Sequence, residues 1–340
     1  MKTAVFCFSD AGAGLAEKVR SLLRLPPAAV HSTEKYAEKY GFTAHEKISA
    51  DMGELFSENG ALIFIGACGI AVRSVAPYLK SKAEDPAVLV LDDRGRYVIP
   101  ILSGHLGGAN ALARTLAGLL GAEAVVTTAT DGAGRFSCDA WAVAHGCALS
   151  SLGAAKAVSA AVLTGDVPVS SELGLPDTLP AGLTRGDTGP VGIRIGVRTD
   201  EPYDTTLRLI PKILVLGVGC RRGTAEETIR AAVTETLSSA GIDPAAVCRV
   251  ASIDVKRDEA GLLGYARSVG AEAVFYPARE LEAVPGEFAE SEFVKRTVGV
   301  GNVCERAAVL GSGGGERIIG KTAREGVTVA AAAMEWRVEF

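Results

Sequence analysis

The glycine-rich segment 103–110 carries the residues of this chain that are best suited to chemistry. Its sequence is SGHLGGAN, and it separates a strand-like run from a helix-like run. Gly104, Gly107 and Gly108 would let backbone N–H groups approach a ligand closely, and a helix starting there would present unpaired donors to negative charge. His105 adds a group that exchanges a proton near neutral pH. The segment is a candidate anion-binding and proton-transfer loop, although a tight turn with an exposed histidine fits the local pattern equally well.

A second candidate is the segment 217–224, GVGCRRGT. The spacing of Thr224 and Glu227 is that of a capping box and predicts a helix start. Arg221 and Arg222 come just before this start. Two guanidinium groups beside a helix N-terminus could clamp a carboxylate or a phosphate, although arginines near turns are commonly solvated.

Two segments, 217–223 and 315–322, resemble nucleotide-binding motifs. The glycines of 217–223 are spaced GxGxxxG and not GxGxxG, which argues against a dinucleotide site. Residues 315–322, GERIIGKT, match the P-loop string, but 316–319 and 326–330 read as two strands of a hairpin. We therefore expect no P-loop, and a nucleotide-dependent enzyme is kept only as a third alternative.

Composition limits the function classes. The chain has 340 residues, of which 48% are hydrophobic and 22% charged, so it should fold with a substantial core. A net charge of -5 argues against non-specific nucleic-acid binding, so an anionic ligand would need a local cluster of cations. The seven cysteines are scattered without a CxxC motif, which argues against disulfides and structural zinc. We expect a cytoplasmic protein, since 3–8 is too short for a signal peptide and no run is long enough to span a membrane.

Two of these cysteines could be considered as nucleophiles. Cys68 and Cys220 each come just before a predicted helix, where a thiolate could be stabilised. Neither is paired with a histidine by spacing. A covalent route therefore stays open, but we expect both to be packing residues.

Short apolar β-rich runs alternate with helical patterns, which predicts parallel βαβ units. The fold class expected is α/β, with two main α/β domains that have mostly parallel sheets and a smaller middle unit. The predicted domains are 1–132, 133–211 and 212–340. In the first domain, 92–95 reads as a hairpin turn. The loops that follow the strands of this domain are expected to bind ligands, as in other open α/β sheets. The strands expected there are 3–8, 61–65, 87–91, 97–102 and 124–127, and helices are expected at 70–80 and 111–120.

Several segments occur in a recognisable order. They are 69–73 (GIAVR), 85–88 (DPAV), 103–110 and 127–131 (TTATD), followed by 217–224, 252–256 (SIDVK), 258–262 (DEAGL), 298–300 (VGV) and 303–305 (VCE). Together they resemble the cobalt-precorrin-5A hydrolase family of anaerobic cobalamin biosynthesis. The resemblance spans nearly the whole chain and is weakest in the middle. The C-terminal part is also similar to a small stand-alone protein of the aerobic pathway.

The resemblance implies a hydrolase that acts on a cobalt-bearing contracted tetrapyrrole. In that family a δ-lactone is opened and the extruded meso-carbon leaves with its methyl group as acetaldehyde. The cobalt would be carried by the substrate, so no cofactor and no protein metal site is expected. We expect no nucleic-acid or membrane partner, and a homo-oligomer is left open. The alternative is a protein that only binds and delivers corrinoid intermediates.

This substrate is flat and rich in carboxylates, so glycine loops and cations should bind it. His105 is the first candidate for the catalytic base, and Glu305 the second if burial raises its pKa. Backbone N–H groups of Gly107 and Gly108 could hold an oxyanion. Lys256 could equally be plain surface charge. The expected binding residues are Arg73, Ser103, Gly104, Gly107, Gly108, Asn110, Thr130, Asp131, Gly219, Arg221, Arg222, Ser252, Lys256 and Lys321.

Overall fold

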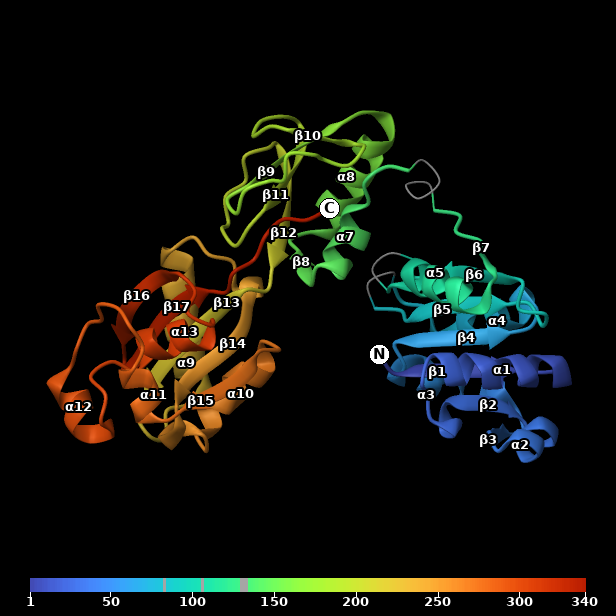
Figure 1. The fold of residues 1–340 in the computed structure, drawn as a ribbon, viewed down its shortest axis with the longest axis horizontal. Helices are drawn as coiled ribbons and strands as arrows, with labels where there is room; N and C mark the ends of the chain where they lie inside the picture. Colours follow the sequence, from blue (N-terminus) through green and yellow to red (C-terminus); the bar gives the residue numbers. More distant parts are fainter. Residues whose placement is uncertain (82–83, 105–106, 129–133) are drawn as a thin grey trace. The chain divides into compact units, whose positions relative to one another are not determined.

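The computed structural model describes residues 1–81, 84–104, 107–128 and 134–340. The chain divides into two compact units, Met1–Val143 and Ala144–Phe340, both drawn in Figure 1. The described residues form three sheets, one of seven strands and two of five. Pairing is mostly parallel in the first two and half parallel in the third, which confirms the predicted α/β class. The domain boundaries after residues 132 and 211 stay a prediction.

The first unit is built on a seven-stranded sheet in the order β3-β2-β1-β4-β5-β6-β7. Its central strands β1, β4 and β5 are buried at every position, as expected for a parallel sheet covered on both faces. The strands are β1 Thr3–Cys7, β2 Val30–Thr33, β3 Thr43–His45, β4 Ala61–Ile65, β5 Ala87–Leu91, β6 Tyr97–Leu102 and β7 Glu123–Ala124. The predicted bounds of β4, β5 and β6 are therefore correct, whereas the strand expected at 124–127 is a two-residue strand.

Helices cover both faces of this sheet. They are α1 Asp10–Leu22, α2 Glu34–Tyr40, α3 Ile48–Glu58, α4 Cys68–Val75 and α5 Ala109–Leu120. Helices α1, α2 and α5 pack on the face that carries Val5, Ile63 and Leu89. Helices α3 and α4 pack on the opposite face, with Phe6 and Phe64. This alternation of neighbouring residues between two cores follows from the two-residue period of a strand.

The hairpin predicted at 92–95 reverses the chain inside the sheet. Strands β1 to β5 are parallel, but β6 pairs antiparallel with β5, with Leu91 opposite Val98 and Val88 opposite Leu102. The carboxyl end of β6 therefore lies at the opposite edge of the sheet from the carboxyl end of β4. This reversal decides which loops can share a site.

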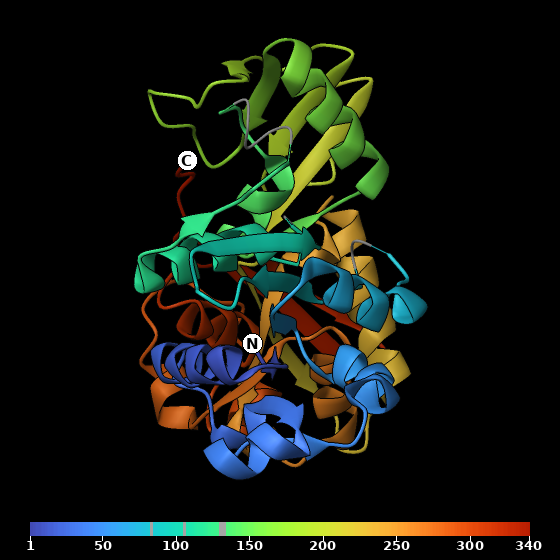
Figure 2. The same ribbon diagram turned by 90° about the vertical axis from the view of Figure 1, so that its right-hand side faces the viewer.

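The second unit begins with a small sheet of order β10-β9-β11-β12-β8. The strands are β8 Cys147–Leu149, β9 Val167–Ser171, β10 Leu183–Arg185, β11 Val191–Ile195 and β12 Thr205–Pro211. Helix α7 (Cys138–Ala144) precedes the sheet. Helix α8 (Leu152–Thr164) packs along its strands, as the green and yellow part of Figure 2 shows.

The last sheet has the order β15-β14-β13-β17-β16. Its strands are β13 Leu214–Cys220, β14 Val247–Ile253, β15 Glu272–Tyr276, β16 Arg317–Arg324 and β17 Val327–Ala333. One face is covered by α9 (Glu226–Ser239) and α10 (Ala260–Ser268), and the other by α11 (Ala278–Glu282) and α13 (Cys304–Gly311). The short helix α12 (Glu292–Val298) lies between α11 and α13 in the chain. No helix in the described part of the chain has the length and apolar character needed to cross a membrane.

Two local predictions in this sheet have different outcomes. The capping box is wrong, because α9 begins at Glu226 after Ala225, and the Thr224 hydroxyl instead donates to the Arg221 carbonyl oxygen. The hairpin is confirmed, because residues 317–322 of the P-loop-like string lie on β16, and the chain then turns at Gly326 into β17. No helix follows the string, so its backbone cannot cradle phosphates as a P-loop does.

Helix α13 packs on β13 backbone to backbone. A Cβ atom on Gly217 would lie 1.7 Å from the carbonyl oxygen of Cys304 and 2.8 Å from the backbone nitrogen of Ala308. Only glycine allows this approach. The contact sets the first turn of α13 directly beside the carboxyl-terminal half of β13.

Candidate functional site

A cavity of about 570 Å³ lies where β13 and β14 end, inside the second unit. Gly219 and Cys220 of β13 and Ile253 of β14 form one side, and Gly326 and Thr328 of the hairpin form another. The order in which strands are added to the sheet reverses at β13. The chain continues from β13 to β14 and β15 on one side and later adds β17 and β16 on the other side. Ligands of open α/β sheets bind at this kind of position.

The remaining wall of the cavity comes from α12 and from the first turn of α13. Val294, Thr297 and Val298 face the cavity from α12, and the segment 301–304 closes it at the start of α13. Much of this wall is apolar, as is common in sites that cover a flat organic ligand.

Four cations predicted from the sequence, Arg221, Arg222, Lys256 and Lys321, line this one cavity. They come from the loop after β13, from the 3-10 turn Asp254–Lys256 after β14, and from β16. Among the described residues, no acidic side chain is part of the lining. The cavity is therefore cationic and suited to a ligand with several carboxylates.

These cations differ in what they already bind. Arg222 pairs with Asp258 at 2.5 Å on the surface, and the ammonium of Lys256 is 3.0 Å from Glu259. Arg221 and Lys321 form no ion pair and no side-chain hydrogen bond with any residue that the structure describes. Since their charge is not neutralised locally, these two are the strongest candidates for meeting substrate carboxylates.

The predicted residue Gly219 lines the cavity, whereas Ser252 does not. Ser252 is fully buried, and its hydroxyl donates to the Val218 carbonyl oxygen at 2.6 Å. This hydrogen bond joins β14 to β13, so Ser252 helps to hold the two strands whose ends line the cavity.

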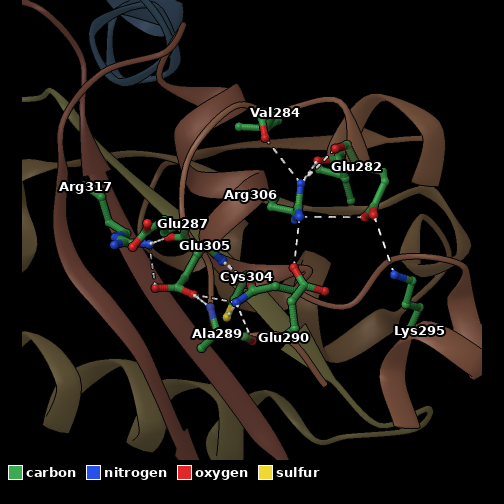
Figure 3. A network of polar contacts seen from close by, with 12 residues as sticks. Glu282, Val284, Glu287, Ala289, Glu290, Lys295, Cys304, Glu305, Arg306 and Arg317 are labelled. Carbon is green, nitrogen blue, oxygen red and sulfur yellow. Dashed lines mark hydrogen bonds and ion pairs between the residues drawn. The ribbon is translucent and has the colours of Figure 1, made fainter. Parts of the chain in front are cut away.

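Glu305 lies outside the cavity lining, and both its oxygens are engaged (Figure 3). One oxygen accepts the backbone N–H of Lys321 at 3.1 Å and pairs with Arg317 at 3.0 Å. The other accepts from the side-chain amide of Asn302 at 2.5 Å and from the backbone N–H of Ala289 at 3.1 Å. The carboxylate thus fixes β16 at Lys321, which is a supporting role.

Arg306, which sequence reasoning missed, anchors the segment that leads to α12. Its guanidinium donates to the carbonyl oxygens of Leu281, Glu282 and Val284 and pairs with Glu290 at 2.9 Å (Figure 3). The side chain is buried, so these bonds are protected from water. Because α12 forms a wall of the cavity, Arg306 contributes to its shape. No spacing in the sequence distinguishes this arginine from a surface one.

Cys220 and Cys304 line the cavity, and their surroundings indicate a packing role for both. Burial raises the pKa of Cys220, and it raises the pKa of Cys304 to about 11. Thiolates are therefore disfavoured at both positions near neutral pH.

In the first unit, the described part of the 103–110 loop is tightly built. Ser103 has a φ of 54°, is buried, and donates its hydroxyl to the Asp85 carbonyl oxygen at 2.9 Å. A Cβ on Gly107 would lie 2.4 Å from the Cβ of Ser103, and Gly108, with a φ of 80°, caps α5. Buried Asn110 donates to the Thr128 hydroxyl at 3.0 Å, and a Cβ on Gly104 would lie 2.8 Å from its amide oxygen. His105, Thr130 and Asp131 lie outside the described residues.

Arg73 does not share an edge of the sheet with this loop. It lies on α4, after β4, where its guanidinium donates to the Gly69 carbonyl oxygen at 3.1 Å. The 103–110 loop follows β6, which runs the opposite way. Ligand loops were expected after both strands, but the hairpin at 92–95 reverses the chain, so these two loops lie at opposite ends of the strands and do not share a site within this sheet.

A chain of polar side chains in the first unit, which runs from buried His31 to exposed Asp51, was also missed. His31 Nδ1 lies 2.8 Å from His45 Nε2, and His45 Nδ1 lies 2.6 Å from an oxygen of Asp51. Burial, followed by the neighbouring His45, lowers the pKa of His31 to about 4. The three residues come from β2, β3 and α3, so no sequence spacing reveals them.

Comparison with known proteins gives a consistent result. The model "Cobalamin synthesis G N-terminal" matches residues 51–131, and "Cobalamin synthesis G C-terminus" matches residues 214–332. Both place the chain among proteins of cobalamin synthesis. The cobalt-precorrin-5A hydrolase of Salmonella typhimurium (strain LT2) is 36% identical over 342 residues, covering 96% of each chain. That of Priestia megaterium is 33% identical over 298 residues, covering 82% of this chain and 79% of its own.

The chain belongs to the cobalt-precorrin-5A hydrolase family, which confirms the resemblance seen in its motifs. A shorter relative, Protein CobE of a Sinorhizobium species, is 39% identical over 101 residues, which are 29% of this chain and 66% of that protein.

Proposed function

We propose that this protein is a cobalt-precorrin-5A hydrolase, which opens the δ-lactone of its substrate and releases acetaldehyde to give cobalt-precorrin-5B in anaerobic cobalamin biosynthesis. The observation that supports this most directly is the cavity at the end of β13, where four cations surround apolar walls. It matches a substrate that is a flat macrocycle with carboxylates on its rim. The family to which the chain belongs supports the same reaction.

The macrocycle would enter the cavity with one edge. The apolar side chains of α12 would cover its flat surface, and Arg221 and Lys321 would bind carboxylates of its rim. Charge-assisted hydrogen bonds of this kind are roughly twice as strong as neutral ones, and guanidinium groups can bind carboxylates in bidentate fashion. Arg222 and Lys256 would add to the positive potential while they keep their protein partners.

In the reaction, water adds to the lactone carbonyl and the acyl C–O bond breaks, leaving a carboxylate and a hydroxyl group. The hydroxyl then loses its proton, its carbon leaves as acetaldehyde, and the electron pair of the broken C–C bond passes to the macrocycle. A base and oxyanion donors are needed for the first step. His105 is our proposal for the base and Gly107 and Gly108 for the donors. The four contacts of Glu305 make it the weaker choice.

Further parts of the proposal concern partners. The cobalt arrives with the substrate, and the protein contributes no metal or cofactor of its own. We propose a cytoplasmic protein without a nucleic-acid or membrane partner, and leave a homo-oligomer open. Metal analysis of the purified protein before and after substrate addition tests the first point.

The reaction is tested by incubating purified protein with cobalt-precorrin-5A and measuring acetaldehyde together with the absorbance spectrum. Release of acetaldehyde with a spectral shift is expected. Tight binding of the intermediate without acetaldehyde would replace the hydrolase by a delivery protein. His105→Ala should reduce turnover at least 100-fold, the lower range for general acid–base catalysis, while His145→Ala serves as a matched control. Near-normal turnover by His105→Ala would remove this residue from the mechanism.

The binding role of the cavity is tested by Arg221→Gln and Lys321→Gln. Each should raise KM by about 10-fold, the equivalent of losing one charged hydrogen bond of about 1.5 kcal/mol. Arg324→Gln is the matched control, because Arg324 lies on the same hairpin but pairs with Glu235 away from the cavity. An equal effect of all three variants would contradict the assignment.

A further inference from the structure

Glu259 stands out among the buried charges near the cavity. It occupies the N-cap position of α10, but its carboxylate makes no capping bond to that helix. One oxygen accepts the backbone N–H of Gly223 at 2.8 Å, and the other is 3.0 Å from the ammonium of Lys256. Its side chain is only 4% exposed. The carboxylate therefore connects two segments that both carry cations of the cavity.

We propose that Glu259 is the positioning residue for the cationic side of this cavity, a role that rests on the proposed binding of a polycarboxylate there. Through Gly223 it fixes the end of the loop that carries Arg221 and Arg222. Through Lys256 it holds a third cation of the lining. Its own carboxylate lies outside the lining, so it acts on the ligand only through these groups.

The bond from Glu259 reaches the turn of the loop where the space beside the backbone is open. Gly223 has a φ of 76°, and a Cβ placed on it would meet no atom within 4 Å. The hydrogen bonds from Thr224 to the Arg221 carbonyl stay inside the loop. The bond from Gly223 to Glu259 instead ties the loop to α10.

The start of α10 lies close enough to the arginine loop for Glu259 to reach the N–H of Gly223. A Cβ on Gly261 would lie 2.1 Å from the carbonyl oxygen of Thr224 and 3.0 Å from the backbone nitrogen of Glu226. The first turn of α10 therefore packs directly against the end of the arginine loop. Glu259, two residues earlier, is brought within reach of Gly223.

The neighbouring acid provides a comparison within the same turn. Asp258 also pairs with the loop, through Arg222, but the two side chains are 65% and 71% exposed. An exposed pair is screened by water and holds its partners weakly, whereas a buried carboxylate left without partners is strongly unfavourable. Two adjacent acids thus contact one loop, and only Glu259 should determine where its cations lie.

The test compares Glu259→Ala, Glu259→Gln and Asp258→Asn in the full chain, with KM and kcat measured by acetaldehyde release. Glu259→Ala should raise KM 10- to 30-fold and change kcat less than threefold, because it disturbs binding and not the reacting atoms. Glu259→Gln keeps an oxygen for the Gly223 N–H and should recover part of the affinity, with a KM three- to tenfold above that of the wild type. Asp258→Asn should change KM less than twofold.

Several outcomes would overturn the proposal. Equal KM values for Glu259→Ala and Asp258→Asn would do so, as would a loss confined to kcat. If Glu259→Ala fails to fold, the double variant Lys256→Met, Glu259→Gln removes the buried charge pair while keeping the shape; a wild-type KM for the folded double variant would also refute it.

A binding measurement separates this proposal from the proposed reaction. The Kd for cobalt-precorrin-5A is obtained by absorbance titration for the same variants. Wild-type protein that binds but releases no acetaldehyde would disprove the hydrolase, and the ratio of Kd between Glu259→Ala and Asp258→Asn would still test the positioning role. A ratio of about 10 or more supports it, and a ratio near 1 refutes it.

Discussion

Acidification should destabilise the first unit through His31. His31 is 7% exposed, and its ring stacks on Phe6 and contacts His45. His45 disfavours a positive charge on His31, whereas the more distant Asp51 favours it. The pKa of His31 is lowered from 6.5 to about 4 in the folded chain. Between these two values the unfolded chain binds a proton that the folded chain does not. The stability present above pH 6.5 is therefore lost as the pH falls toward 4.

The magnitude follows from the two pKa values. A difference of one pKa unit corresponds to about 1.4 kcal/mol, so the full loss below pH 4 is about 3 kcal/mol. At pH 5.0 the loss should be about 2 kcal/mol relative to pH 7.0. An effect of this size is measurable, since domains are stable by only about 5–15 kcal/mol.

Hydrogen exchange of peptides from β2, β3 and α3 measures this unit without the second one. The free energy of opening is compared at pH 7.0 and pH 5.0, after correction for intrinsic exchange rates, in wild-type protein and in His31→Asn. The difference between the two proteins removes the contributions of all other titrating groups. The variant should lose about 2 kcal/mol less than the wild type on acidification. The same loss in both proteins would show that His31 is not responsible.

Two other predictions concern the second unit. Gly217→Ala should destabilise it by about 3 kcal/mol, the upper end of the usual range for overpacking, because the added methyl group would collide with the Cys304 carbonyl oxygen. Urea unfolding measures this loss. Gly118→Ala, in open space on α5, is the control and should not destabilise; comparable losses would contradict the steric explanation. Equilibrium dialysis with ATP and magnesium should show no retention, because residues 315–322 lie on a hairpin; stoichiometric binding would refute this.

Local patterns predicted much of the fold. The runs 61–65, 87–91 and 97–102 are strands with the expected bounds, because each is a continuous apolar β-rich segment between turn residues. The P-loop-like string was assigned to a hairpin because 316–319 and 326–330 both read as strands, and the structure has this hairpin. In these cases the local preference and the tertiary environment agree.

The site was predicted less completely, because contacts decide it. The four cations of the cavity could be expected from their places at the ends of strands. Residue type did not reveal that the carboxylate of Glu305 would contact four protein groups. It also did not reveal that Glu259 would bind a loop far away in the sequence instead of capping its own helix. The Thr224 capping box failed for a similar reason, since a hydroxyl group can satisfy the preceding turn as well as the following helix.

The residues that surround the cavity all fall between positions 219 and 328, within one sheet and its own connections. If the proposed function holds, the residues that bind the ligand are encoded by one continuous stretch of the gene. Such a stretch can be fused, duplicated or transferred without the rest of the gene, so a cationic cavity of this kind can be combined with different catalytic domains.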